Sequence, residues 1–173
     1  MKFKIEKGTE TYGKLMALKK RMTAARKAVN AVLDELGAER YTPAYGAMVG
    51  GISGVELSAK PEGWVRVGGG SSRIYYPSAK NKAMRERFHA LPKVSHDELN
   101  EIVGFKRSEE IDDETLVWRR YNCPGVHFGQ GVVLMDTGRA KYSPLNADIV
   151  EILESEYRRL SEKEEKRSKT SAA

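Results

Sequence analysis

A single seam of apolar residues near the N-terminus constrains the fold of this chain more than any other feature. Apolar side chains recur there at alternating intervals of three and four, at Leu15, Leu18, Met22, Ala25, Val29, Val32 and Leu36. This spacing places them along one side of an α-helix. Thr9 offers an N-cap, and Gly37 supplies the left-handed conformation that commonly ends a helix. The sequence therefore predicts a helix from about Glu10 to Leu36.

A helix of this length has two common uses. It either lies across a sheet as the spine of a fold, or it forms half of a coiled coil between two copies of the chain. The small residue Ala25 within the seam and the strand-like segments nearby favour packing against a sheet. The alternative is a homo-oligomer joined through this helix.

Short segments with alternating apolar residues predict a set of strands. They are Phe3–Ile5, Val55–Ala59, Trp64–Val67, Arg73–Tyr76, Leu116–Tyr121 and Val132–Met135. The glycine-rich run 68–72 joins two of these strands as a hairpin. Residues 41–54 contain several glycines and indicate a tight connector or a loop, and residues 123–131 indicate a turn.

Further segments predict shorter helices. Residues 80–91 suit a helix that Pro92 ends, and Ser95 with Glu98 forms a capping box at the start of another. A last helix is predicted to begin near Asn146. Its apolar face consists of Ile149, Ile152, Leu153, Tyr157 and Leu160.

These elements predict an α+β fold, with a small antiparallel sheet packed against the long N-terminal helix and two or three further helices. The length of 173 residues fits one domain, over residues 1–160. Residues 161–173 have almost no apolar content, so we expect them to fray into solvent as a polar tail.

Composition narrows the classes of partner. The single cysteine, Cys123, cannot close an intramolecular disulfide, which agrees with a reducing compartment. No apolar run approaches the ~18 residues that a membrane span needs, and no signal-peptide core follows Met1, so we expect a cytoplasmic protein without a membrane partner. The net charge of +6 favours an acidic partner, such as nucleic acid, a nucleotide or an acidic protein face.

A basic stripe accompanies the apolar seam of the predicted long helix. Lys19, Lys20, Arg26 and Lys27 lie away from the seam. They either contact the phosphates or carboxylates of a partner or form an ordinary solvated face. We select all four as candidate partner-binding residues.

The predicted strands mix arginines with aromatic residues, a combination from which surfaces that stack single-stranded bases are built. They carry Trp64, Arg66, Arg73, Tyr75, Tyr76, Trp118, Arg119, Arg120 and Tyr121. We select Arg66, Arg73, Tyr75 and Arg119 as candidate ligand contacts. The ordinary alternative is that the strand aromatics pack the core. The run 68–73 can present N–H groups to a phosphate, but without the Gly-Lys-Ser/Thr ending of a P-loop an ordinary hairpin loop is the simpler interpretation.

The residue patterns give little support to catalysis or to metal binding. Cys123, His127 and Asp136 suggest a thiolate, a base and an orienting carboxylate, but proximity within a Pro-Gly turn does not bring such groups together. His89, His96 and His127 share no zinc-binding spacing. We therefore expect a non-enzymatic protein without a cofactor.

Four segments resemble an uncharacterised family of small proteins encoded by tailed phages and prophages. They are Met1–Gly8, Glu35–Tyr41, Lys60–Trp64 and Ile149–Tyr157, and the resemblance covers most of the chain up to about Leu160. It supplies no catalytic residues. It implies a phage accessory protein that is expressed inside the bacterial host.

Three functional hypotheses follow. The first is a non-enzymatic binder that interferes with a host protein or complex, such as a defence system, through a basic surface. The second is a nucleic-acid or nucleotide binder that uses the arginine and aromatic strand faces. The third is a virion or assembly component that oligomerises through the long helix.

Overall fold

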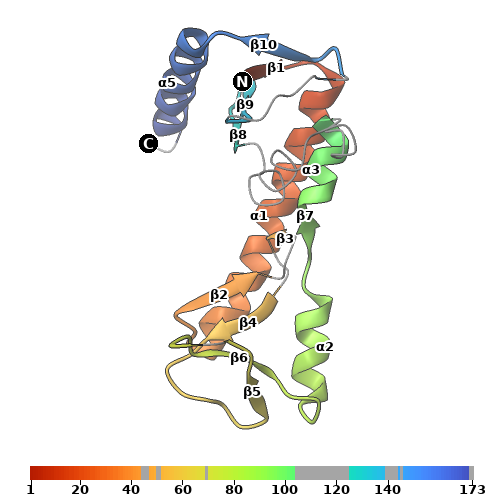
Figure 1. Ribbon diagram of the computed structural model, residues 1–173, viewed down its shortest axis with the longest axis vertical. Coiled ribbons are helices and arrows are strands. Elements are labelled where there is room, and N and C mark those ends of the chain that lie inside the picture. Colours follow the sequence, from red (N-terminus) through yellow and green to blue (C-terminus); the bar gives the residue numbers. More distant parts are fainter. Residues whose placement is uncertain are drawn as a thin grey trace. The chain divides into compact units, whose positions relative to one another are not determined.

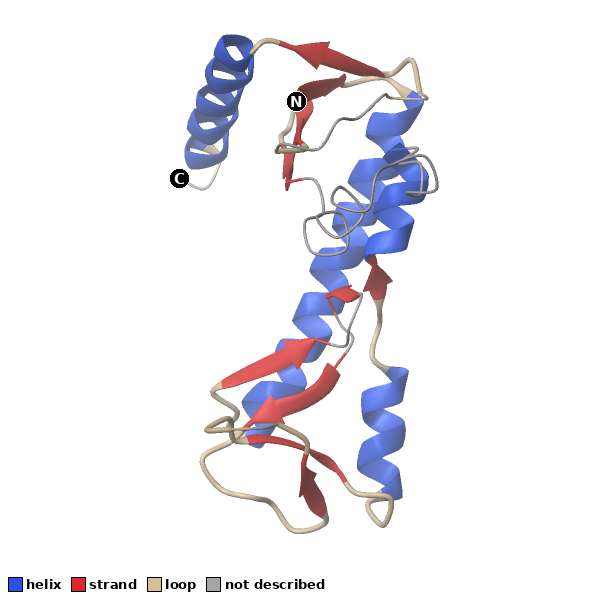
Figure 2. Cartoon of the chain, viewed as in Figure 1, coloured by secondary structure: helices blue, strands red, loops and turns tan. Residues whose placement is uncertain are grey.

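A computed structural model describes residues 1–43, 47–49, 52–68, 70–103, 125–138, 144 and 146–171. Figure 1 shows the arrangement of its elements and Figure 2 their types. The helices are α1 (Glu10–Leu36), α2 (Lys82–Ala90), α3 (His96–Val103) and α5 (Glu154–Thr170). The strands are β1 (Lys2–Glu6), β2 (Arg40–Pro43), β3 (Ala47–Val49), β4 (Ile52–Glu56), β5 (Trp64–Arg66), β6 (Ile74–Pro77), β7 (Val94–Ser95), β8 (Gly125–Phe128), β9 (Val132–Asp136) and β10 (Ile149–Ile152).

The described strands pair only in antiparallel fashion, and the fold is α+β as predicted. The chain divides into two compact units, which we call the terminal unit (Met1–Lys19 with Glu98–Ala173) and the central unit (Lys20–Asp97). Helix α1 contributes residues to both units. The single domain predicted over residues 1–160 stays a prediction.

Helix α1 has the bounds that the sequence predicts. The Tyr12 N–H donates a hydrogen bond of 3.2 Å to Thr9 Oγ1, which caps the helix start. Gly37 has a φ of +61° and ends the helix. The seam residues Leu15, Leu18, Ala25, Val29 and Val32 are buried, and Met22 and Leu36 are half-buried.

The central unit packs a four-stranded sheet, in the order β2-β4-β6-β5, against α1 and α2. The predicted hairpin of β5 and β6 is confirmed, and α2 confirms the helix expected within residues 80–91. The core of this unit, which we call the central core, is apolar and aromatic. It consists of Val29, Val32, Leu33, Ile52, Val55, Leu57, Trp64 and Phe88.

The glycine-rich segment 41–54 does not form the connector or loop that we expected. Its described residues belong to β2, β3 and the start of β4, which begins at Ile52 rather than at Val55. Gly54 explains how a strand tolerates glycine here. A Cβ atom on Gly54 would lie 2.6 Å from Ile74 Cγ2, so β4 and β6 approach as closely as they do because residue 54 has no side chain.

The terminal unit contains a second four-stranded sheet, in the order β10-β1-β9-β8. Phe3 and Ile5 of β1 pair in register with Met135 and Val133 of β9, and all four side chains are buried on one face of the sheet. Lys2 and Lys4 alternate with them and lie on the other face. The first predicted strand and the predicted strand at Val132–Met135 are therefore confirmed.

Helix α3 starts where the sequence indicates. It begins directly after Ser95, and the flanking residues Val94 and Leu99 are 1% and 2% exposed, as a hydrophobic staple requires. The strand predicted at Leu116–Tyr121 lies outside the described residues. The turn predicted over residues 123–131 is instead partly strand, since β8 pairs with β9.

The C-terminal prediction is wrong in two respects. Residues 149–152 form strand β10, not the start of a helix, because they pair with β1 from Ile5↔Ile149 to Lys2↔Ile152. Helix α5 follows after a short connection and continues to Thr170 (Figure 2), where we expected a frayed tail. Apolar spacing at Tyr157 and Leu160 predicted the first part of this helix, but its only buried residue is a carboxylate, Glu164, so apolar spacing could not show that the helix continues beyond Leu160.

Candidate functional site

The four residues selected as a basic stripe on α1 differ in their exposure. Lys20, Arg26 and Lys27 are exposed, and the described residues offer them no hydrogen-bond or ion-pair partner. Lys19 is half-buried instead. Its Nζ donates to the Phe128 carbonyl oxygen at 3.1 Å and lies 5.9 Å from the centre of the Phe128 ring. We therefore define the α1 stripe as Lys20, Arg26 and Lys27.

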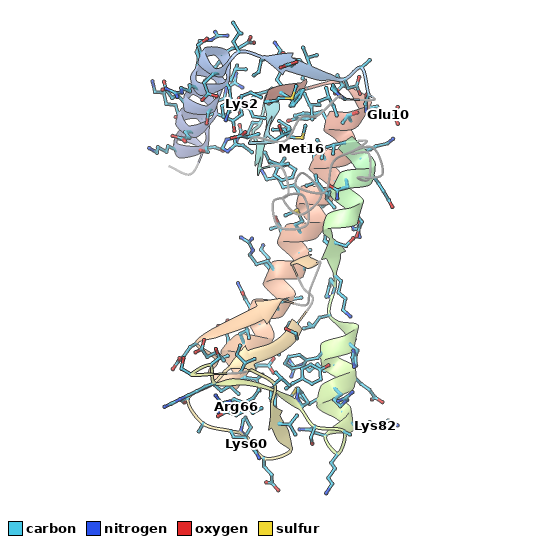
Figure 3. All side chains as sticks on the ribbon, in the orientation of Figure 1. Lys2, Glu10, Met16, Lys60, Arg66 and Lys82 are labelled. Carbon is cyan, nitrogen blue, oxygen red and sulfur yellow. The ribbon has the colours of Figure 1, made fainter. Side chains whose placement is uncertain are left out.

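Arg66 stabilises the hairpin loop between β5 and β6. Its guanidinium donates to the carbonyl oxygens of Gly70 at 2.6 Å and of Ser72 at 2.7 Å (Figure 3 labels Arg66). The N–H groups of Val67 and Gly68 both bond to the carbonyl oxygen of Ile74. These N–H groups are therefore not directed at a ligand, and the ordinary hairpin loop is the better interpretation.

Of the other strand residues that we selected, Tyr75 is the direct register partner of Arg66 in the β5–β6 pair, so the two share one face of the sheet. Tyr75 pairs with the fully buried Val55 and packs against the central core, so it lies on the core-facing side of the sheet. Arg73 is exposed and donates to the Ser58 carbonyl oxygen at 3.2 Å. Arg119 lies outside the described residues. Tyr75 thus neighbours Arg66 but is half-buried against the central core, and the stacking platform stays a prediction.

Of the catalytic candidates, His127 lies on β8 and Asp136 on the neighbouring strand β9. Asp136 accepts hydrogen bonds from Lys2 Nζ and from the Gly138 N–H. Burial alone would raise the pKa of Asp136, but these bonds and the positive charge of Lys2 hold it below its ordinary value. Cys123 lies outside the described residues. Within the described part of the chain, no three His, Cys, Asp or Glu residues are grouped as metal ligands would be.

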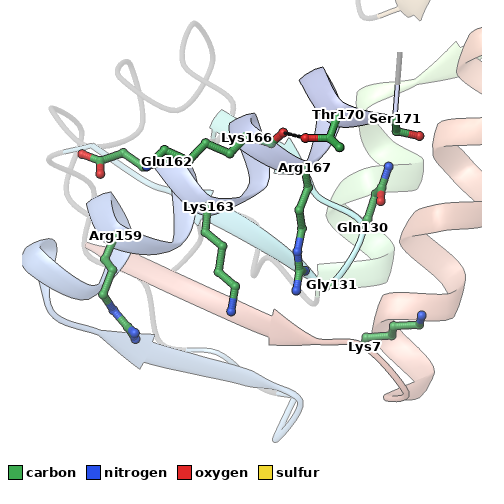
Figure 4. Close-up of a pocket in the computed structure, with 10 residues that line it drawn as sticks. All are labelled: Lys7, Gln130, Gly131, Arg159, Glu162, Lys163, Lys166, Arg167, Thr170 and Ser171. Carbon is green, nitrogen blue, oxygen red and sulfur yellow. Dashed lines mark hydrogen bonds between the residues drawn. The ribbon is translucent and has the colours of Figure 1, made fainter. Parts of the chain in front are cut away.

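A basic cleft on α5 is the feature that sequence reasoning missed. It has a volume of about 990 Å³ and lies between α5 and the turn that joins β8 to β9 (Figure 4). We call it the α5 cleft. It is lined by Lys7, Gln130, Gly131, Arg159, Glu162, Lys163, Lys166, Arg167, Thr170 and Ser171.

Glu164 holds α5 against this turn. One of its carboxylate oxygens accepts hydrogen bonds from the Gln130 N–H at 2.6 Å and the Gly131 N–H at 3.3 Å, and the other pairs with Arg167 Nη1 at 2.7 Å. Burial alone would raise the pKa of Glu164, but the two N–H groups and the guanidinium lower it below its ordinary value. A buried carboxylate therefore replaces the apolar contacts that usually attach a helix.

The two glycines of the turn permit this close approach. A Cβ atom on Gly129 would lie 2.5 Å from a Glu164 oxygen, and one on Gly131 would fall on the Arg167 guanidinium. The Tyr12 hydroxyl donates to the carbonyl oxygen of Gln130 at 2.8 Å. Burial and the nearby charge of Glu164 raise the pKa of this tyrosine, so it stays a donor at neutral pH. The turn is thus fixed from both sides.

Positive charge dominates the α5 cleft. Arg159, Lys163 and Arg167 project from the same side of α5 in Figure 4, and the Glu162 carboxylate is turned away from them. Lys7 lines the cleft from the turn after β1, and its N–H is bonded to the Gly131 carbonyl oxygen at 3.2 Å. The sequence contained one signal of this site. Basic residues recur at positions 159, 163, 166 and 167, a spacing that places them on one helix face.

No family model, curated protein or solved structure matches this chain. Among the described helices, none combines the length and the apolar character that a membrane span requires. Two basic surfaces, the α1 stripe and the α5 cleft, are the candidate binding sites of the described residues.

Proposed function

We propose that this protein is a non-enzymatic binder that engages an acidic partner through its basic helix surfaces. The observation that carries this proposal is the α1 stripe. Lys20, Arg26 and Lys27 are exposed on a helix whose other side is buried, and no described carboxylate pairs with them. Their charges are available to an incoming partner.

The physical advantage of such a stripe is rapid and selective association. Exposed charges on a rigid helix attract an oppositely charged surface over about a Debye length, ~8 Å at physiological salt, and repel basic competitors. Seam residues fix the helix from behind, so its backbone loses little conformational freedom when a partner binds. The chain's net charge of +6 acts in the same direction.

For the partner, we propose a component of a bacterial host cell, such as a defence protein or complex. This part of the proposal rests on the resemblance of the sequence to small phage and prophage proteins. A stoichiometric binder needs a surface rather than a catalytic site, and exposed basic surfaces are what the described residues offer.

The test is a pull-down from bacterial lysate, with and without nuclease, followed by identification of what is retained. The stripe variant is Lys20→Glu, Arg26→Glu, Lys27→Glu. The control is Lys60→Glu, Lys80→Glu, Lys93→Glu, which makes the same change in net charge at exposed positions outside the stripe. We expect wild type and the control to retain a specific partner that the stripe variant loses. Equal retention by all three proteins, or no retained partner, would refute the proposal.

The structure affects the two other hypotheses differently. Oligomerisation through the long helix needs a free apolar seam, and the seam residues of α1 are mostly buried within the chain itself. For nucleic-acid binding through the strands, Tyr75 is half-buried against the central core, and Arg66 already donates to the carbonyl oxygens of its own hairpin loop. The α5 cleft offers that hypothesis a different surface.

A further inference from the structure

We propose that the α5 cleft binds the phosphate backbone of a nucleic acid. This inference deepens the proposed function and rests on it in one respect, that the protein is a binder of acidic partners. It assigns a separate surface and a defined ligand chemistry, a chain of phosphodiester groups. All residues that line the cleft belong to the terminal unit.

The charge of the cleft is the first support. Its lining contains five cationic side chains, from Lys7, Arg159, Lys163, Lys166 and Arg167, and a single carboxylate, from Glu162. Glu162 is turned away from the cations that project together from α5 (Figure 4). Glu164, the other carboxylate nearby, is only 4% exposed and is already occupied by Arg167 and two N–H groups. The cations are therefore largely unneutralised.

The spacing of the cations is the second support. Arg159, Lys163 and Arg167 recur at every fourth residue, so their Cα atoms span about 12 Å of the helix axis at ~1.5 Å per residue. Duplex DNA presents one negative charge per ~1.7 Å of its axis, and a row of this length meets several of them. A row suits a chain of phosphates better than it suits a single phosphate ion.

The rigidity of the site is the third support. Arg167 is fixed by its ion pair with Glu164, and Lys7 is fixed at its backbone by Gly131. An arginine guanidinium has five N–H donors, so Arg167 retains donors for a phosphate while it pairs with Glu164. Part of the cost of ordering the binding groups is therefore already met by the fold.

The lining also indicates how selective the site is. None of its residues is aromatic, and the turn contributes only Gln130 and Gly131. Bases cannot stack there, so contacts to phosphates and sugars dominate, and these carry no sequence information. The same lack of a stacking surface disfavours a free nucleotide as the ligand. We therefore expect binding that depends little on base sequence.

The experiment measures fluorescence anisotropy of a labelled mixed-sequence duplex DNA and of the matching single strand, over roughly 50–200 mM salt. The cleft variant is Lys163→Gln, Lys166→Gln. The control is Arg158→Gln, Lys169→Gln, which removes the same charge from α5 at two positions that do not line the cleft. Circular dichroism checks that each variant keeps its helices. If the cleft variant loses helicity, the single variant Arg159→Gln replaces it, since Arg159 is exposed and lines the same cleft.

We expect wild type and the control to bind with a steep salt dependence. The cleft variant is expected to bind at least about tenfold more weakly, with a slope of log affinity against log salt reduced by about 2. Equal affinities and slopes for the cleft variant and the control would overturn the inference, as would an absence of salt-sensitive binding in wild type. Displacement of the DNA by ATP at equal phosphate concentration would assign the cleft to free nucleotides and would overturn the backbone assignment.

The two proposals can fail separately. If DNA does not bind but a nuclease-resistant protein partner is retained through the α1 stripe, only the inference about the α5 cleft is wrong. If DNA binds through the cleft and no partner depends on the stripe, the proposed function fails and the cleft assignment stands.

Discussion

The central core and the attachment of α5 represent two different ways to hold a helix. In the central core, Phe88 of α2 packs edge-on against Trp64 and Tyr76, with ring centroids 5.7 Å and 5.8 Å away. In the terminal unit, α5 is held chiefly by charged groups, with Glu164 as its only buried residue. The comparison teaches that apolar burial fixes the α2 region, whereas ion pairs and hydrogen bonds position the basic cleft.

Lys2 and Lys4 extend the charged attachment of α5. Lys2 pairs with Asp136 and Glu154 and lies 4.7 Å from the centre of the Tyr157 ring (Figure 3 labels Lys2). Lys4 pairs with Glu156 at 3.0 Å. Each of these contacts stabilises the attachment of α5 less than a buried aromatic ring stabilises the central core, because solvent weakens partly exposed ion pairs. We therefore expect α5 to detach under milder conditions than those that unfold the central core.

The largest expected effect is in the central core. Phe88→Ala removes a ring that is 2% exposed and should lower the free energy of unfolding by about 3–5 kcal/mol. The measurement is urea denaturation followed by tryptophan fluorescence. The control is Val65→Ala on β5, where the side chain is 44% exposed and the change should be below about 0.5 kcal/mol. A loss below about 1 kcal/mol for Phe88→Ala would contradict an aromatic core.

The next effect is the release of α5 by Glu164→Gln. The amide cannot satisfy both N–H donors and Arg167 as the carboxylate does, so the helix should lose about 1–3 kcal/mol of attachment. Two measurements report this weaker attachment of α5: amide hydrogen exchange of residues 160–170, and tryptic cleavage after Lys163 and Lys166. Glu165→Gln, at an exposed position of the same helix, serves as the control. Unchanged exchange in Glu164→Gln would show that other contacts hold α5.

Acidification should release α5 in wild type. The folded-state pKa of Glu164 lies below its ordinary value of 4.5, so its contribution is complete above about pH 4.5 and is lost as the pH falls through the lowered folded pKa. Hydrogen exchange of α5 against pH measures this loss. Asp136 and Glu154 also have lowered pKa values, so the informative quantity is the difference between wild type and Glu164→Gln. An identical pH dependence in both proteins would contradict the role of Glu164.

The same comparison explains which elements the sequence predicts. Helix α1, the β5–β6 hairpin and α3 are marked by apolar spacing or capping residues within a few turns of chain, so local reasoning finds them. Strand β10 depends on pairing between Ile5 and Ile149, and α5 depends on a bond between Glu164 and the turn at Gln130. Such long-range polar contacts leave no periodic signal. The cleft was missed for a different reason: its basic residues do recur on one helix face, but most of them lie on a segment that we expected to fray.

The smallest expected effect is that of Lys4→Gln, which tests whether single ion pairs hold α5. The Lys4 side chain is 23% exposed and pairs with Glu156 and Glu6, and hydrogen bonds to these carboxylates raise the pKa of the lysine. Its contribution is therefore present at neutral pH and is lost only as the pH rises through that raised value. We expect Lys4→Gln to lower the free energy of unfolding by less than about 1 kcal/mol, and by less still at high salt.

The measurement for Lys4→Gln is thermal denaturation at low and high salt. The control is Lys14→Gln, because the ion pair of Lys14 with Glu10 lies on exposed helix surface. A loss as large as that of Phe88→Ala would mean that the charged attachment equals the aromatic core in strength, and the contrast between the two regions would be wrong.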